Sequence, residues 1–244
     1  MKINKMELSN KAIRIRDLLK EDPMSPVDIF RLINKIEKLS LILYPLGKNI
    51  SGMCIRMKES SIIVVNTDCS KGRQNYTLAH ELYHYYFSDE NSSSICYFDQ
   101  SGKQDEERKA DIFASYFLLP SPALDEMLCK KERIDLKMII QIEQSYGISH
   151  KALLTRMVMD EYIGENEIKE YENDVIRNAS YMGFDIRLYE ITKEEGTFGY
   201  YIEKVDELYR TKRISEDKRE ELYRECMRED LLNDDAEEGR YIVD

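Results

Sequence analysis

The chain has 244 residues, enough to bury a sizeable core in one large domain or two small ones. Hydrophobic residues make up 42% and charged residues 34%, a balance typical of soluble globular proteins. No apolar run approaches the roughly 20 residues that a membrane-spanning helix needs, and the N-terminus lacks the continuous apolar segment of a secretion signal. We therefore expect a cytoplasmic protein with no membrane partner.

The net charge of −11 is concentrated in the last third of the chain. Residues 1–164 carry 23 basic and 23 acidic side chains, whereas residues 165–244 carry 13 basic and 24 acidic ones. The sequence shows no basic stripe of the kind that follows phosphates along a nucleic acid. General binding to polyanions is therefore not expected, and the acidity belongs to a C-terminal region.

The five cysteines are odd in number and form no C-x-x-C pair, which argues against a disulfide framework and favours a reducing compartment. Cys69 and Cys96 flank the histidine motif described below, so each is a candidate for an extra metal ligand. The alternative is that they pack as small apolar residues, as lone cysteines usually do.

The predicted elements begin with helices and strands in the first 66 residues. Two helices are expected at about 9–20 and 27–38, followed by strands at 39–46, 52–57 and 62–66, the last two joined as a hairpin. Helices at about 74–87 and 105–118 enclose a polar, Ser-rich loop at 88–104. Further helices are expected at about 134–145, 149–163, 166–180 and 200–230, with a weak strand pair around 184–202.

The helix over about 74–87 carries His80-Glu81-Leu82-Tyr83-His84, which fits the pattern H-E-x-x-H. Residues four apart on a helix point the same way, so His80 and His84 can share one Zn²⁺. Glu81 is then placed to take a proton from the attacking water and to relay it to the leaving amine. The alternative is a pair of surface histidines, but the chain has only three histidines, so this spacing rarely arises by chance.

Two histidines leave zinc one protein ligand short, and the helix over 105–118 offers candidates. Glu107 and Asp111 lie together along the edge of its apolar stripe. Two carboxylates beside a buried face are costly unless something compensates for their charge. A zinc ion bound to Glu107, with Asp111 hydrogen-bonded to a ligand histidine, would do so. A solvated acidic helix start explains the same residues, and Glu106 also lies near the stripe, so the spacing leaves both questions open.

These motifs resemble those of the ImmA/IrrE family of metallopeptidases. Members of this family carry a motif similar to R-Q-x-[FY]-T-L-A-H-E-L-x-H. It is followed by E-x-x-A-[ND]-x-F-A and by a leucine-rich stretch that ends in proline. Here the corresponding segments are Arg73 to His84, Glu107 to Ala114 and Phe117-Leu118-Leu119-Pro120. The resemblance covers roughly residues 23–165 and favours Glu107 over Glu106 as the third ligand. Tyr83 stands where relatives commonly have glycine, and we expect it to affect packing more than metal binding.

The resemblance implies an α+β fold. We expect a zincin-like peptidase core at 1–130, made of a small antiparallel sheet and the active-site helix. A helical subdomain resembling a helix-turn-helix is expected at 131–164, and an acidic, mostly helical region at 165–244.

The resemblance also implies a zinc-dependent endopeptidase. Its protein substrate would be an intracellular regulator, often a helix-turn-helix repressor of a mobile element or a stress regulon. The implied site has His80, His84 and Glu107 as metal ligands, Asp111 behind them and Glu81 as the catalytic residue. A different class of function also remains open, namely a regulatory binding module that docks a partner on this fold without proteolysis.

Three other features have weaker functional interpretations. The segment 136–159, with Gly147 at its turn and Ser149 as a cap, resembles a helix-turn-helix, but its second helix offers few groups that could read DNA, so DNA binding is not expected. His150, the histidine outside the motif, is a candidate oxyanion stabiliser or simply a helix-start residue. Tyr97 is one candidate among many tyrosines for donating to a tetrahedral intermediate.

Overall fold

The computed structural model describes residues 3–89, 92–97, 105–128 and 133–232. The strands are β1 (Leu39–Tyr44), β2 (Ile50–Ile55), β3 (Ser61–Asn66), β4 (Ser93–Tyr97) and β5 (Gly196–Gly199). The helices of the first half are α1 (Lys5–Leu18), α2 (Ile29–Leu32), η1 (Ile33–Lys35), α3 (Lys71–Phe87), α4 (Asp105–Leu118) and α5 (Ser121–Leu128). Those of the second half are α6 (Leu136–Tyr146), α7 (His150–Met159), α8 (Ile168–Tyr171), α9 (Val175–Tyr181), η2 (Ile186–Tyr189), α10 (Tyr200–Arg210), α11 (Glu216–Glu225) and η3 (Glu229–Leu232).

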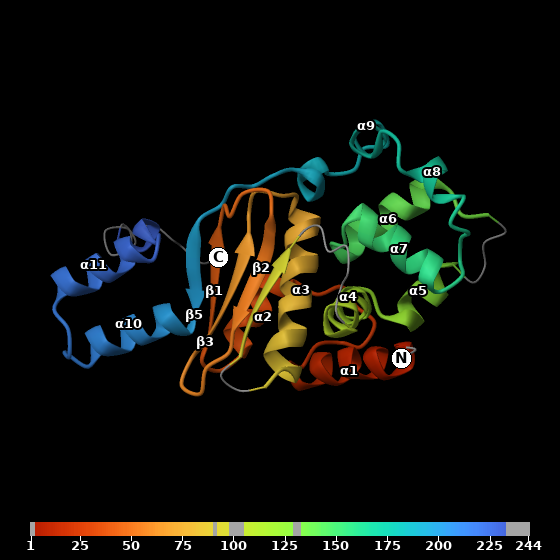
Figure 1. Ribbon diagram of the computed structural model, residues 1–244. Coiled ribbons are helices and arrows are strands. Elements are labelled where there is room, and N and C mark those ends of the chain that lie inside the picture. The colour runs from red at the N-terminus through yellow and green to blue at the C-terminus, as the bar shows by residue number, and fades with distance from the viewer. Residues whose placement is uncertain (1–2, 90–91, 98–104, 129–132, 233–244) are drawn as a thin grey trace, which may run out of the picture.

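The molecule has three parts arranged side by side (Figure 1). The sheet and α3 form the centre, the helices α4 to α9 lie beyond α3, and the hairpin of α10 and α11 projects from the opposite edge of the sheet. The predicted α+β class is confirmed. No helix among the described residues combines the length and the apolar character that crossing a membrane requires.

The strand order in the sheet is β4-β2-β3-β1-β5. The predicted hairpin of β2 and β3 is confirmed, with Gly52 opposite Val65. The expected all-antiparallel sheet is wrong for one pair, because β1 runs parallel to β3.

The parallel pair exists because the chain crosses the end of β3 on its way from β1 to β2. The amide of Asn66, a residue with no exposed surface, supports this crossing. Its Oδ1 accepts from the Leu46 N–H at 3.0 Å, and its Nδ2 donates to the carbonyls of Gly47 and Ile50 at 2.6 Å. One buried side chain thus satisfies the backbone groups of a short irregular connection.

The helix α3 lies against β2 and β3 on one side and against α4 on the other (Figure 1). One face of α3 is buried in these contacts, with Ala79 and Leu82 at 0% exposure and Tyr83 at 2%. Tyr83 packs on the rings of Phe87 and Phe113, in agreement with its expected role in packing.

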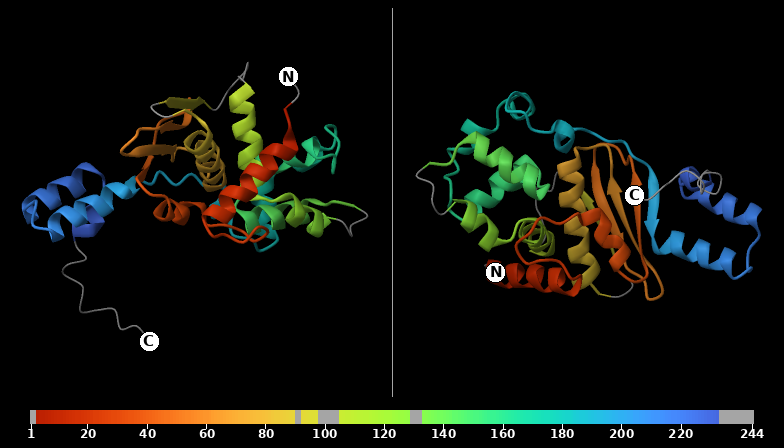
Figure 2. Two further views of the ribbon diagram at one scale, coloured as in Figure 1. Left: turned by 90° about the horizontal axis from the view of Figure 1, so that it is seen from below. Right: turned by 180° about the vertical axis from the view of Figure 1, so that it is seen from behind.

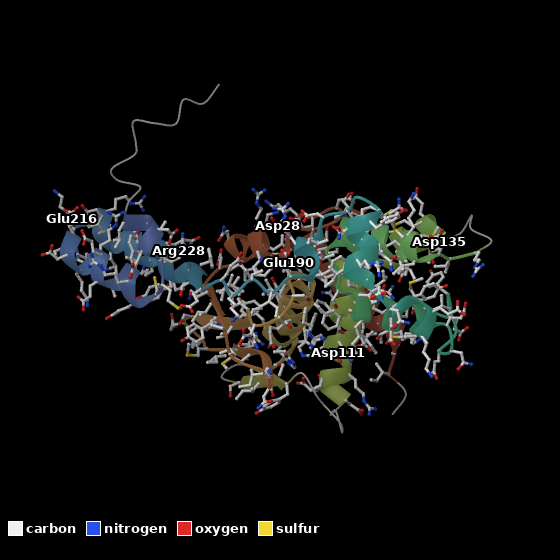
Figure 3. All side chains as sticks on the ribbon, turned by 90° about the horizontal axis from the view of Figure 1, so that it is seen from above. Asp28, Asp111, Asp135, Glu190, Glu216 and Arg228 are labelled. Atoms are coloured by element: carbon white, nitrogen blue, oxygen red, sulfur yellow. The ribbon has the colours of Figure 1, made fainter. Side chains whose placement is uncertain are left out.

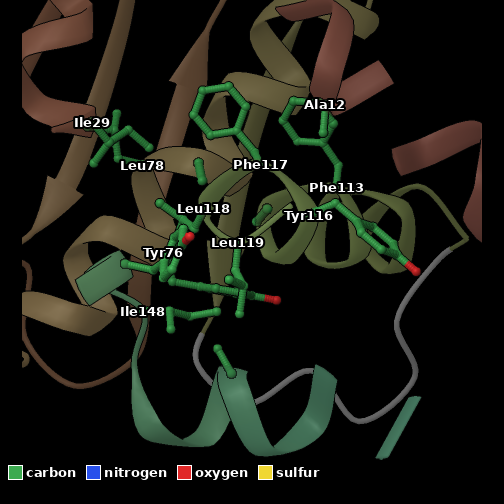
Figure 4. Close-up of a cluster of buried hydrophobic side chains, with 14 of the residues drawn as sticks. Ala12, Ile29, Tyr76, Leu78, Phe113, Tyr116, Phe117, Leu118, Leu119 and Ile148 are labelled. Carbon is green, nitrogen blue, oxygen red and sulfur yellow. The ribbon is translucent and has the colours of Figure 1, made fainter. Parts of the chain in front are cut away.

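The bounds of α4 agree with the predicted helix, and its apolar stripe forms the centre of the main core (Figure 4). Phe113 and Phe117 are fully buried and stack at 5.7 Å between ring centroids. Figure 4 shows them together with Ala12 of α1, and the same cluster includes Leu78 of α3 and Ile148 beside α7. The core is therefore continuous from the sheet through the helical part.

The expected loop at 88–104 contains a strand. Residues 93–97 form β4, which pairs antiparallel with β2 and lies at one edge of the sheet. The sequence concealed this strand because an edge strand uses its main chain for pairing and leaves most side chains in water. Among its residues Cys96 alone is buried. The remainder of the predicted loop lies largely outside the described residues.

The C-terminal region departs most from expectation. Two short helices, α8 and α9, stand where one was expected at 166–180, and a turn at 211–215 separates α10 from α11 within the expected helix at 200–230. The predicted strand pair around 184–202 is wrong, because β5 pairs with β1 at the far edge of the sheet. α10 and α11 lie side by side as a hairpin (Figure 2), with a small core of their own made of Val205, Tyr223 and Cys226. The division at residues 130 and 164 stays a prediction.

Candidate metal centre

The two histidines of α3 point to one place beside the sheet. The Nε2 atoms of His80 and His84 lie 3.3 Å apart, as expected for residues one helical turn apart. Each ring is also held at its other nitrogen. His80 Nδ1 donates to Asp111 Oδ1 at 3.0 Å, and His84 Nδ1 lies 3.4 Å from Ser88 Oγ. Both Nε2 atoms are thereby directed to a common point.

Glu107 brings a carboxylate to the same point from α4. Its Oε2 lies 3.3 Å from His80 Nε2, and its Oε1 lies 3.2 Å from His84 Nε2. Glu106 points elsewhere, accepting from the Tyr83 hydroxyl at 3.0 Å and from Lys109. The structure therefore distinguishes the two glutamates that the helical periodicity left as alternatives. Asp111 lies one turn further along α4, where that helix runs beside α3 (Figure 3).

A fourth potential ligand comes from the edge strand. The Sγ of Cys96 lies 3.3 Å from His80 Nε2, and Cys96 is 1% exposed. One ligand atom from each of His80, His84, Cys96 and Glu107 lies within 4.8 Å of the other three. Cys69, the other cysteine that flanks the motif, donates instead to the carbonyl of Asn66.

The spacing of these atoms suits a single tetrahedral metal ion. Nitrogen and oxygen ligands at about 2.0–2.1 Å from Zn²⁺ lie about 3.4 Å from one another, and a thiolate at about 2.3 Å lies about 3.5 Å from a ligand nitrogen. The observed separations between His80, His84 and Glu107 are 3.2–3.3 Å. The donor set of imidazole, carboxylate and thiol also matches zinc or a similar divalent ion.

Glu81 lies beside this cluster in a fully buried position. Neither of its carboxylate oxygens has a hydrogen-bond partner among the described residues. The carboxylate packs against Gly52 of β2, where an added Cβ would come within 2.9 Å of Glu81 Oε1. An unpaired buried carboxylate is costly, and such groups gather where chemistry requires them.

The ionisable groups of the cluster shift one another's pKa values in opposite directions. Burial lowers the pKa of His80, but the carboxylates of Asp111 and Glu107 outweigh it and raise that pKa to about 9 in the metal-free protein. Burial raises the pKa of Glu107, yet hydrogen bonds with His80 and His84 hold it well below its ordinary value. Burial raises the pKa of Glu81.

Two other sequence candidates lie outside the cluster. His150 begins α7, and its Nδ1 lies 2.5 Å from the buried carboxylate of Glu143, while its Nε2 donates to the Tyr171 carbonyl. Tyr97 ends β4 and is 47% exposed. Neither is among the residues that could hold the ion.

One basic residue of the helix-turn-helix-like segment, Arg156, makes its contacts inside the protein. Arg156 is 1% exposed and donates to the Leu119 carbonyl and to Ser121 Oγ. It contributes to the packing of α7 on the rest of the protein.

The family comparison agrees with this geometry. Residues 44–158 match the IrrE N-terminal-like domain of peptidase family M78. This part of the chain is a metallopeptidase domain of the ImmA/IrrE family. The matched region runs from the end of β1 to the end of α7, so it contains α3, β4 and α4 together with the pair α6 and α7. Comparison with curated protein sequences finds no match to the chain.

Sequence reasoning missed Gly52 at this metallopeptidase site and left the choice of Cys96 open. Gly52 could have been noticed as a glycine inside a predicted strand, because such a glycine often marks a close approach by another group. Cys96 was one of two flanking cysteines that the sequence offered as an extra metal ligand, and nothing in the sequence chose it over Cys69. The place of Cys96 beside the histidines depends on β4, which the polar sequence did not reveal.

Proposed function

We propose that this metallopeptidase uses zinc and hydrolyses a peptide bond within a protein substrate. The convergence of His80, His84 and Glu107 on one point beside the buried Glu81 is the observation that supports this proposal most strongly. Their separations suit one tetrahedral ion, and three protein ligands with one open position is the usual arrangement of a catalytic zinc site.

Each residue of the proposed site has a separate task. His80, His84 and Glu107 hold the ion, and Asp111 fixes the ring of His80 so that Nε2 faces it. A bound Zn²⁺ would supply Lewis acidity, polarising the peptide carbonyl and making the attacking water more acidic. Asp111 is a positioning residue in this scheme, because its contact is with His80.

Glu81 is the proposed general base. Its carboxylate accepts a proton from the attacking water and then gives that proton to the leaving amine. Two features suit it to this exchange. Its oxygens are not committed to other donors among the described residues, and burial raises its pKa above that of an ordinary glutamate. A raised pKa makes the carboxylate a stronger proton acceptor, and it still ionises near neutral pH when a cation lies beside it.

The position of β4 supports cleavage within an extended chain. β4 is an edge strand of the described sheet, and Cys96 places this edge next to the site. An extended substrate segment can add to such an edge through main-chain hydrogen bonds. Main-chain pairing of this kind holds a substrate segment in extended form, and contacts with its alternate side chains determine which segment is selected.

We propose a regulator as the substrate, with a helix-turn-helix repressor of a mobile element or a stress regulon as the leading class. This step rests on family analogy. We also propose that the reaction takes place in the cytoplasm. The free thiols of Cys54, Cys69, Cys96 and Cys226 favour a reducing compartment. The division into a peptidase core at 1–130, a helical subdomain at 131–164 and an acidic region at 165–244 remains part of the proposal.

One observation favours a second candidate, a regulatory binding module without proteolysis. Cys96 lies where it could complete a set of four protein ligands, and closed four-ligand sites are typical of structural zinc. On this alternative the ion would stabilise a docking surface. The two candidates differ in whether any peptide bond is broken.

The test is incubation of the purified protein with the repressor encoded beside its gene, with and without a chelator, followed by mass analysis of the products. We expect two fragments that sum to the intact repressor plus one water, no fragments with chelator, and recovery when zinc is restored. A repressor that binds the protein but stays intact under all conditions would favour the binding module.

A further inference from the structure

Cys96 occupies a specific position within the metal centre. Its Sγ lies 3.3 Å from His80 Nε2, and it is within 4.8 Å of the ligand atoms of His84 and Glu107. These are separations expected between ligands of one ion. The side chain is 1% exposed, so it is held inside the site and not at its rim.

The backbone around Cys96 fixes this position. Cys96 stands opposite Gly52 in the pairing of β4 with β2, and its carbonyl accepts from Ser51 Oγ at 3.1 Å. Its neighbours Ile95 and Tyr97 are exposed, as expected from the alternation of side chains along a strand. Cys96 shares the inner face of β4 with Ser94, and its thiol is the buried side chain that reaches the ligand cluster.

A second observation concerns the group that the thiol stands beside. Glu81 is fully buried, and both of its carboxylate oxygens lack a hydrogen-bond partner among the described residues. The carboxylates of Glu81 and Glu107 are the charges that act most strongly on the Cys96 thiol. Cys96 thus lies beside both the proposed metal ligands and the proposed base.

We propose that Cys96 is a fourth protein ligand whose thiolate closes the metal site in the resting enzyme. The inference rests on the proposed zinc peptidase function and adds a regulatory state to it. On closing, a sulfur–metal bond forms and the thiol proton leaves to solvent. On opening, that bond breaks, the sulfur regains a proton, and water enters the vacated position, so no oxidant or reductant is required.

The placement of Cys96 on β4 makes such opening feasible. β4 is joined to the described sheet through β2 alone, whereas His80, His84 and Glu107 lie on long helices packed in the core. The sulfur can therefore move away while the other three ligands stay in place. A peptide that pairs with the outer edge of β4 would act on the strand that carries the thiol.

The experiment is the absorption spectrum of the full chain loaded with Co²⁺, which replaces zinc and reports its ligands. We expect an intense thiolate-to-cobalt charge-transfer band in the near ultraviolet for the wild type. The band should disappear in Cys96→Ala while one Co²⁺ per chain is still bound. Cys54→Ser is the matched control, because Cys54 is a buried thiol on the neighbouring strand outside the ligand cluster, and it should keep the band.

The wild-type spectrum does not require any variant to fold and does not require a substrate. A wild type that binds Co²⁺ without the charge-transfer band would overturn the ligand assignment, whether or not the protein is a peptidase. Conversely, an intense band in a protein that cleaves nothing would support the ligand and count against the proposed function.

Closure itself is tested by hydrolysis of the repressor once cleavage has been observed. Cys96→Ala should raise the rate at saturating zinc, by about tenfold if one resting molecule in ten is open. Cys54→Ser should leave the rate unchanged. An unchanged or lower rate in Cys96→Ala, with zinc content and thermal stability preserved, would show that the thiol does not restrict the site.

Discussion

Gly52 on β2 leaves space for the carboxylate of Glu81 on α3. A Cβ at Gly52 would lie 2.9 Å from Glu81 Oε1 and 2.6 Å from Thr77 Cγ2, closer than real Cβ atoms come to such neighbours. The same Cβ would lie 2.9 Å from the Val64 carbonyl, which belongs to the backbone of the adjacent strand. The proposed base therefore depends on the absence of a single methyl group in the sheet.

The variant Gly52→Ala tests this dependence. We expect cleavage to fall because Glu81 must move, and the free energy of unfolding to fall by about 1–3 kcal/mol because the surrounding strands are tightly packed. Metal content should stay near one ion per chain, since the three atoms nearest to the added methyl belong to Thr77, Glu81 and Val64 and not to His80, His84 or Glu107. Gly164→Ala is the control, because its nearest neighbour is the flexible Glu167 side chain at 3.3 Å. Full cleavage activity in Gly52→Ala would contradict the account.

Glu107 and Glu106 form a matched pair for testing the third ligand. Glu107→Gln removes a carboxylate that lies 3.2–3.3 Å from both histidines, so the affinity for zinc should fall and cleavage should be lost. Glu106→Gln removes an equal charge one residue earlier, where the carboxylate accepts from Tyr83 and Lys109. Zinc content after dialysis separates them, and equal retention by both variants would remove Glu107 from the site.

Asp111 should act on the metal through His80. The variant Asp111→Asn keeps the size of the side chain but weakens its hold on the His80 N–H, so zinc affinity should fall by about 10–100-fold. The measurement is a competition titration against a chelator of known affinity. Excess zinc should restore most of the cleavage, because Asp111 has no direct role in the reaction. Failure of excess zinc to restore cleavage would indicate a different task for Asp111.

The raised pKa of His80 predicts two opposite pH dependences. In the metal-free protein its pKa is about 9, above the ordinary 6.5. Protonated His80 therefore stabilises the fold below about pH 6.5, and this contribution is lost as the pH rises through about 9. Zinc must displace the proton from Nε2, so its affinity should increase over the same range. Thermal unfolding of the metal-free protein and zinc titrations from pH 6 to 9 measure the two trends. If stability and zinc affinity changed in the same direction with pH, the raised pKa assigned to His80 would be contradicted.

The sequence predicted the parts of the site that lie on long periodic helices. The spacing of His80 and His84 placed them on one side of a helix, and the stripe of α4 placed Glu107 and Asp111 at its edge. Helical periodicity alone did not distinguish Glu107 from Glu106, because an apolar stripe is at least about 100° wide and neighbouring residues differ by about 100° around the axis, so both can lie near it. Only the angle at which α4 crosses α3 directs Glu107 to the histidines.

The features that the sequence missed depend on long-range pairing. β4 lies within a polar, Ser-rich segment, and its formation depends on backbone hydrogen bonds to β2. β5 lies more than 150 residues from β1, with which it pairs, and no local pattern specifies that partner. The parallel pairing of β1 with β3 is supported by the buried amide of Asn66, which in the sequence is only the last residue of a predicted strand.

Arg156 illustrates a similar limit on functional interpretation. In the sequence it is a basic residue on the second helix of a helix-turn-helix-like segment. In the structure it is buried, with Tyr116 against its guanidinium and Asp160 bonded to its Nε. The positive charge of Arg156 did not reveal its burial, because the sequence does not show which residues will surround and neutralise an arginine in the fold.

The variant Glu81→Gln tests the central claim most directly, with metal content and repressor cleavage measured on the same preparation. The account predicts one zinc per chain, unchanged thermal stability within about 1 kcal/mol, and a fall in the cleavage rate of at least about a hundredfold. Cleavage at the wild-type rate by a zinc-loaded Glu81→Gln protein would show that Glu81 is not the base, and the proposed mechanism would have to be abandoned.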